Sequence, residues 1–309
     1  MYVQYTSLVI EGNGLKHLLF PAIEGGNLGD GTSLKISDLQ ITETTSTGLT
    51  LSALVNLTNP TEYSATVPYV DIHLVKNGSI LGHATARDIH VQPGQNDNLL
   101  VQAVYAPLDY GGPEARAIGT ELLSQYISGF NTTLTLQTHN GTIPSQPALG
   151  EALSKFAIEV PTPHLSVPRK PSDPNDPNGT PDDETHFIDD ATMHLFTSTA
   201  TFTLLSPLRH STIYIEHIDA TAMYKGDDVG HITYDMPFAV PPIDKDGKGV
   251  MSPRLPVDWS LGSAGYDAIR DALGGTLKLS ADAVVGIRLE KFRETIWFKG
   301  KSIGAHIRV

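Results

Sequence analysis

The 309-residue chain contains no cysteine, which excludes disulfides, cysteine-ligated zinc, iron–sulfur clusters and thiol catalysis. Basic residues are also scarce, since 21 Lys and Arg face 34 Asp and Glu, for a formal net charge of −13. Nucleic-acid binding requires clustered Lys and Arg, so we expect no nucleic-acid partner. No apolar run approaches the roughly 18 residues of a membrane span. The start, Met1–Tyr5, lacks the basic residues of a signal peptide. We expect no membrane span in this chain.

Sequence motifs of catalysis are absent as well. The chain has no G-x-S-x-G nucleophile elbow, no H-E-x-x-H zinc motif, no P-loop and no G-x-G-x-x-G. Acidic residues are plentiful, but no pair stands out at catalytic spacing, so a glycan hydrolase is only a weak third alternative. The sequence therefore predicts a protein that is not an enzyme and has no catalytic residue, cofactor or metal ligand.

One segment divides the chain. Residues 166–190 hold five prolines and seven acidic residues and cannot build a core. We predict a Pro/Asp-rich linker there, between a first β-sandwich repeat at residues 1–165 and a second at 191–309. Charge is unequal between them. The first repeat has six basic and fourteen acidic residues, whereas the second has thirteen of each.

The two parts look like copies of one unit. Residues 49–60 and 196–207 both alternate polar and apolar residues before an Asn-Pro or Ser-Pro, as half-buried strands do. The predicted inward faces are Leu49, Leu51, Ala53, Val55 and Leu57 in the first copy and Phe196, Ser198, Ala200, Phe202 and Leu204 in the second. A hairpin follows in each copy, turning at Asn77-Gly78 and at Lys225-Gly226. Matching positions in the two copies are 147 residues apart at the prolines and 148 apart at the turn glycines. The extra residue predicts a bulge near Glu216-His217.

Each copy then has one predicted short helix, at residues 113–126 and 263–273. Alternating strands follow these helices at 132–138 and 276–289, and a final strand pair is expected at 295–299 and 303–308. Strands joined by hairpin-length turns favour antiparallel sheets. The predicted fold is all-β, with two tandem immunoglobulin-like antiparallel β-sandwiches, each with one short helix.

The repeat resembles the late-embryogenesis-abundant type 2 domain. The resemblance rests on the N-P-T at residues 59–61, the K-N-G-S-I-L-G-H-A hairpin at 76–84 and V-Q-P-G-Q-N at 91–96. The whole chain looks like the tandem luminal domains of fungal vacuolar-membrane proteins of the termination-of-autophagy family. The matching motifs are S-P-R-L-P-V-D-W at 252–259, A-L-G-G-T-L-K at 272–278 and K-G-K-S-I-G-A-H-I-R at 299–308. Such proteins carry a transmembrane helix before the repeats, so we expect a luminal segment of a longer protein or a shortened relative.

Twelve histidines are many for this length. His83 and His231 occupy matching places beside glycines in the two copies. They are either solvent-facing strand residues or parts of a pH sensor, because histidine titrates near pH 6.5. Protonation of all twelve would take the formal charge from −13 to −1.

Five of the eleven asparagines stand in Asn-x-Ser/Thr sequons, more than chance gives. The glycosylation candidates are Asn56, Asn77, Asn131, Asn140 and Asn178. They favour a luminal glycoprotein over a β-protein that is merely rich in Thr and Asn.

Two functions of different kinds follow. The first is a non-catalytic interaction or scaffold module in a vacuolar or endomembrane lumen, with an unidentified protein partner and a role in autophagy that the resemblance implies. The alternative is binding of an apolar ligand, such as a lipid, between the sheets. An apolar cavity would favour the alternative, and a densely packed interior would favour the scaffold.

Overall fold

The structure is a computed structural model. It describes residues 34–59, 62–154, 157–162, 187–243, 248–260, 262–273 and 277–308. Contacts divide the chain into two compact units. The first includes residues 50–105 and 134–160, and the second includes 40–49, 106–133 and the chain from residue 161 onward. Strands make up 59% of the structure and helices 16%, which confirms the all-β class.

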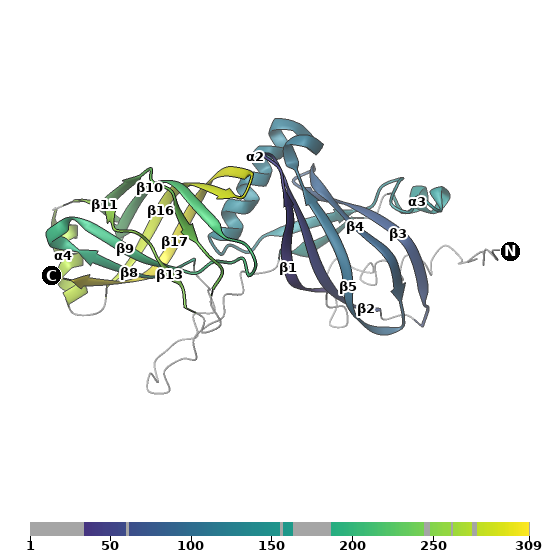
Figure 1. Cartoon of the computed structure of the whole chain (residues 1–309), viewed down its shortest axis with the longest axis horizontal. Coiled ribbons are helices and arrows are strands. Elements are labelled where there is room, and N and C mark those ends of the chain that lie inside the picture. Colours follow the sequence, from purple (N-terminus) through teal and green to yellow (C-terminus); the bar gives the residue numbers. More distant parts are fainter. Residues whose placement is uncertain are drawn as a thin grey trace. The chain divides into compact units, whose positions relative to one another are not determined.

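The first sheet has seven strands in the order β1-β2-β5-β4-β3-β6-β7. Figure 1 shows β3, β4 and β5 side by side in this sheet. The bounds are β1 Leu34–Thr44, β2 Leu49–Asn59, β3 Ala65–Lys76, β4 Ser79–Val91, β5 Gly94–Tyr105, β6 Thr133–Gln137 and β7 Ala157–Pro161. The helix α3, Pro147–Leu153, was not expected from the sequence.

The second sheet follows the path β13-β9-β8-β17-β16-β10-β11-β15. Two further strands, β12 and β14, pair with β10 and β9. The bounds are β8 Ile188–His194, β9 Thr199–Leu204, β10 Ile213–Tyr224, β11 Asp227–Tyr234, β12 Phe238–Val240, β13 Val250–Met251, β14 Leu255–Pro256, β15 Asp258–Trp259, β16 Lys278–Leu289 and β17 Phe292–Arg308. In this sheet the end of β17 lies parallel to β8, which departs from the antiparallel prediction.

A short segment joins the two margins of this second sheet. Leu255 and Pro256 pair with β9, while Asp258 and Trp259 pair with β11. One extended stretch of five residues therefore contacts strands from both ends of the sheet path. The sheet curls upon itself, and its apolar face becomes the interior of the second unit.

The hairpins are confirmed in both copies. Asn77 and Gly78 have φ of 49° and 78°, and Lys225 and Gly226 have φ of 53° and 96°. These positive values are what a tight two-residue hairpin turn requires. The bulge predicted near Glu216-His217 is confirmed as well, since the pairing of β10 with β16 shifts register between Ile215 and His217.

Two local predictions are wrong. Phe196 was expected on the inward face of a strand, but it lies in the 3₁₀ turn η1 (Leu195–Thr197) and is 82% exposed. Ser198 follows with a φ of 48°, so the strand begins only at Thr199. The final strand pair is one continuous strand, β17, because a register shift opposite Leu279 and Ala281 absorbs the turn-like residues Lys301 and Ser302.

One helix is longer than predicted, and another has the predicted bounds. The helix α2 runs from Pro107 to Ile127, with a break at Gly112 (φ 71°) before the expected start at Pro113. It belongs to the second unit, where it packs against β17. The helix α4 is Ser263–Leu273, as predicted. The boundaries at 165/166 and 190/191 stay a prediction, since residues 163–186 of the linker region lie outside the described residues.

Candidate functional site

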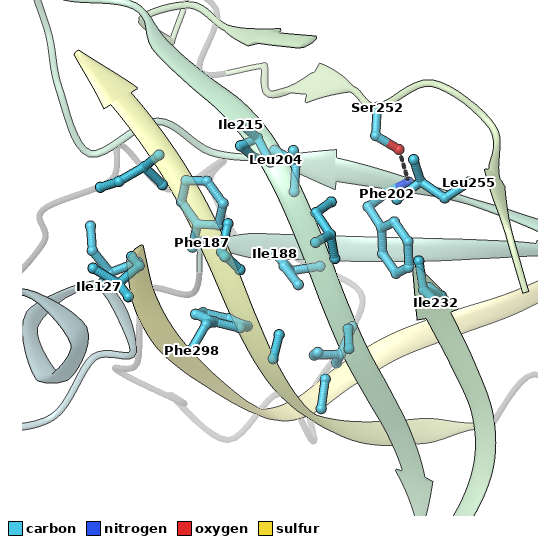
Figure 2. A pocket seen from close by; sticks show the side chains of 18 of the residues that line it. Ile127, Phe187, Ile188, Phe202, Leu204, Ile215, Ile232, Ser252, Leu255 and Phe298 are labelled. Atoms are coloured by element: carbon cyan, nitrogen blue, oxygen red, sulfur yellow. Dashed lines mark hydrogen bonds between the residues drawn. The ribbon is translucent and has the colours of Figure 1, made fainter. Parts of the chain in front are cut away.

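The second unit has a partly open apolar cavity of about 120 Å³ inside its curled sheet. In Figure 2, Phe202, Ile232 and Leu255 gather at one end of the cavity, and Phe187, Phe298 and Ile127 gather toward the other. Ile127 comes from the last turn of α2, and the other five come from the sheet or the residue that precedes it. The interior is therefore hollow as well as apolar.

The cavity exists because the side chains on two paired strands are small. Ala220 lies opposite Ala283, and Ala222 lies opposite Ala281, in the pairing of β10 with β16. All four alanines line the cavity. Along β16 the inward row continues through Val285 to Ile287, while the intervening Val284 faces outward and is 46% exposed. Strand geometry at about 3.4 Å per residue makes the row from Ala281 to Ile287 roughly 20 Å long, a long and narrow apolar surface.

The polar groups of the cavity wall are already occupied. The Ser252 hydroxyl oxygen accepts a hydrogen bond from the Phe202 backbone N–H at 2.9 Å (Figure 2). The same hydroxyl donates to the Pro253 carbonyl at 2.8 Å. The Thr221 hydroxyl lies 3.4 Å from Nδ1 of His231. These are the two lining residues with polar side chains. The cavity thus offers dispersion and desolvation to a ligand and no hydrogen bond.

The two singled-out histidines share one environment. His83 Nδ1 lies 3.1 Å from a carboxylate oxygen of Asp71, and His231 Nε2 lies 3.4 Å from one of Asp219. In each copy the aspartate is on the first strand of the hairpin and the histidine on the second. The sequence placed these histidines at matching positions but gave no indication of the aspartates, which also lie 148 residues apart. Both histidines are partly exposed, at 24% and 46%.

Asp71 is the centre of a larger group in the first unit. His139 Nε2 lies 3.9 Å from the same carboxylate oxygen, and the His139 ring stacks on His73 with centroids 4.0 Å apart. Nδ1 of His139 accepts from the Gly141 N–H, and its buried Nε2 makes no hydrogen bond to any described residue. Burial lowers the pKa of His73 below 6.5; His139 and His83 add to the lowering, and Asp71 opposes it. No group of side chains with metal-binding geometry is present in the described ranges.

The lowered pKa of His73 predicts that the folded protein is less stable in acid. Because the pKa of His73 is lower in the folded state, the unfolded chain binds more protons below about pH 6.5, and stability falls as the pH drops through that range. His73→Gln removes this contribution. We expect the variant to lose less stability than the parent between pH 7.5 and 5, measured by urea denaturation followed by circular dichroism. His90→Gln, which removes a ring bonded to Thr66 on the same hairpin, is the control. An equal loss in His73→Gln and the parent would contradict the prediction.

Four of the five sequon asparagines lie in the described ranges. Asn77, Asn131 and Asn140 are exposed. Asn56 is half-buried on β2, and its side-chain oxygen accepts a hydrogen bond from the Asn98 N–H at 2.9 Å. Asn178 lies outside the described residues. Their glycosylation stays a prediction.

The described residues form a protein of two β-rich domains in tandem. Residues 32–150 match the model of the Tag1-like fourth LEA-2 like domain, and residues 180–297 match that of the Tag1-like fifth LEA-2 like domain. The two matches follow one another in chain order, as tandem domains. No curated protein matches the chain. These findings suggest a non-catalytic module. Within the described residues, no helix is long and apolar enough to cross a membrane.

From the sequence, an apolar cavity was only an alternative, and the residues that form it were not identified. The only signal was the alternation of small residues, Ala220 and Ala222 on one strand and Ala281 and Ala283 on another. Without the register that pairs them, nothing indicated that the small side chains meet across one face.

Proposed function

We propose that this protein is a non-catalytic binding module whose second unit takes an extended apolar chain, such as the acyl chain of a lipid. The supporting observation is the cavity inside the curled sheet, whose wall is apolar and whose polar side chains already have partners. A site without free hydrogen-bonding groups selects for hydrocarbon. The volume of about 120 Å³ is close to that of engineered cavities that accept a benzene ring. The cavity therefore takes only one end of such a chain, a segment of about six carbons.

Filling the cavity tests the proposal. Ala283→Leu adds three carbons inside the cavity, and Val284→Leu changes the next residue, which faces outward. The probe is cis-parinaric acid, whose polyene fluorescence rises when it leaves water. We expect saturable binding by the parent and by Val284→Leu, and at least tenfold weaker binding by Ala283→Leu, which corresponds to about 1.4 kcal/mol.

The outcome separates the two functions. Thermal melting establishes that each variant is folded. Absence of saturable binding by the folded parent, or equal binding by the two variants, would overturn the proposal and leave the scaffold role as the better account.

The second candidate is a scaffold role in the lumen of a fungal vacuole or related endomembrane, with a role in autophagy. The similarity to Tag1-like domains and the exposure of Asn77, Asn131 and Asn140 support it. Expression in a fungal secretory host followed by intact mass measurement is the test. We expect an added glycan mass that disappears on enzymatic deglycosylation, and an unmodified mass would count against luminal exposure.

A further inference from the structure

A turn at residues 139–142 closes against the edge of β3 in the first unit. The Asp71 N–H donates to the Thr142 carbonyl at 2.9 Å, past the end of β6. Within the turn, the His139 N–H donates to the Thr142 hydroxyl at 2.7 Å, and the Thr142 N–H donates to the His139 carbonyl at 2.9 Å. Thr142 is fully buried. The turn therefore supplies the acceptor for a backbone N–H of β3 that β6 does not reach.

The closed turn requires a neutral imidazole at His139. The Gly141 N–H donates to Nδ1 of His139 at 3.1 Å. A ring nitrogen that accepts carries no proton, whereas an imidazolium carries protons on both nitrogens. Protonation would place an Nδ1–H against the Gly141 N–H, and this hydrogen bond would be lost. The ring has little room to adjust, because a Cβ at Gly141 would lie only 3.1 Å from Cε1 of His139.

The other nitrogen of the His139 ring does not compensate for this loss. Nε2 is buried and has no hydrogen-bond partner among the described residues. The carboxylate oxygen of Asp71 lies 3.9 Å from it, beyond hydrogen-bond range. The ring also stacks on His73, with centroids 4.0 Å apart and an interplanar angle of 9°. A positive charge on His139 therefore lies against a second ring that can itself become positive, and two such charges repel.

Asp71 cannot balance the charges that form in acid. Its carboxylate also lies 3.1 Å from Nδ1 of His83, so the rings of His73, His83 and His139 gather around one negative charge. With neutral rings the group carries a formal charge of −1, and with three imidazolium ions it carries +2. These charges are partly buried, so water screens their repulsion only in part. Opening of the turn would relieve that repulsion.

The other charged groups near this turn do not restore the balance. Burial, followed by the charge of Asp71, raises the pKa of Tyr69, so this phenol stays neutral. The Arg87 guanidinium lies 5.0 Å from the centroid of the Tyr69 ring and adds a permanent positive charge. β6 has no ionisable side chain, and the charged residue of α3 is Glu151, which is exposed.

We propose that the 139–142 turn is a pH-sensitive latch, closed on β3 while His139 is neutral and released when the surrounding imidazoles are protonated. Release breaks the hydrogen bond from the Gly141 N–H and withdraws the Thr142 carbonyl from Asp71. A backbone N–H on the edge of β3 is then left without its acceptor. The latch does not rest on the proposed function, because it belongs to the first unit and the apolar cavity belongs to the second.

Amide hydrogen exchange of the full chain tests the latch. We expect the protection factors of the Gly141 and Asp71 amides to fall about tenfold or more between pH 7.5 and 5, after correction for the intrinsic pH dependence of exchange. Amides paired between β4 and β5 are the internal reference and should keep their protection. The fall should reverse on return to pH 7.5. Unchanged protection of Gly141 and Asp71 relative to the reference would overturn the proposal.

His139→Asn separates the titration from the turn. An Asn side-chain oxygen accepts from the N–H two residues further on, as the imidazole does here, and it does not titrate. We expect the protection of Gly141 in this variant to change by about twofold or less between pH 7.5 and 5. His90→Gln, on the same hairpin, is the control and should behave as the parent does. A fall in His139→Asn as large as that of the parent would overturn the proposal.

His73→Gln provides a second variant, since it takes one of the three imidazoles out of the group. We expect a smaller fall in the protection of Gly141 than in the parent, and an equal fall would overturn the proposal. Circular dichroism at both pH values establishes that each variant is folded. The cis-parinaric acid assay reports on the second unit alone, so failure of the latch and failure of the acyl-chain proposal are distinguishable.

Discussion

Gly82→Ala is expected to destabilise the first unit by about 3 kcal/mol, at the upper end of overpacking effects. Gly82 on β4 pairs with Leu74 of β3 and with Tyr105 of β5. A Cβ at this position would lie 1.8 Å from the Val104 carbonyl oxygen and 3.1 Å from Cα of Tyr105. The obstacle is backbone, which cannot move aside without breaking the pairing of β4 with β5. Far-UV circular dichroism during urea denaturation is the measurement.

The repeat provides a matched comparison. Gly230 is the equivalent residue of the second copy, but a Cβ there meets side chains, with Val257 Cγ1 at 3.1 Å and Trp259 Cε3 at 3.2 Å. Side chains can yield, so Gly230→Ala should cost about 1 kcal/mol. Both tryptophans belong to the second unit, so their fluorescence should report Gly230→Ala and be unchanged in Gly82→Ala. Equal stability of Gly82→Ala and the parent would contradict the steric argument.

Local features were the predictable part of this fold. The Asn77-Gly78 and Lys225-Gly226 turns follow from Asn77 and the two glycines, which tolerate positive φ, and the bulge in β10 follows from a one-residue slip between copies. The bulge shows only when the two copies are compared, whereas each turn signal is contained in two neighbouring residues. Such features are decided by backbone sterics rather than by distant packing.

Features decided by tertiary pairing were not predictable. The K-G-K-S stretch at residues 299–302 favours a turn locally. The seven strand residues before it and the six after it nevertheless pair with or continue along β16 and β8, and they keep β17 in one piece. Phe196 fits the alternation of its neighbours, but Ser198 adopts a left-handed conformation and ends that alternation. Context overrode the local pattern in both cases.

The candidate sites depend on register, which the sequence did not supply. The cavity exists because alanines on β10 and β16 face one another, and the carboxylates beside His83 and His231 stand on the neighbouring strands. Each of these is a relation between residues that are distant along the chain.

The edge of β17 is also covered by residues that are distant along the chain. β8 pairs only with Gly304–Arg308, so an earlier stretch of β17 presents backbone N–H groups to the side away from β16. Two serines of the helical segment meet them: Ser124 Oγ accepts from the Trp297 N–H at 3.1 Å, and Ser128 Oγ accepts from the Lys299 N–H at 3.0 Å. Trp297 Nε1 also donates to Glu121 at 2.7 Å. Helix hydroxyls thus take the place of a neighbouring strand and cover an edge that could otherwise pair with another chain.

Ser124→Ala is expected to destabilise the second unit by about 2 kcal/mol, because the Trp297 N–H loses its acceptor at a site where Ser124 is fully buried. Thr120→Ala is the control one turn earlier, since its hydroxyl bonds only back to the Arg116 carbonyl, and a change within about 0.5 kcal/mol is expected. Tryptophan fluorescence during urea denaturation measures both, and hydrogen exchange of the Trp297 amide should accelerate in Ser124→Ala alone. Equal stability of the two variants, with unchanged exchange at Trp297, would show that the helix covers the strand edge through packing rather than through this hydrogen bond.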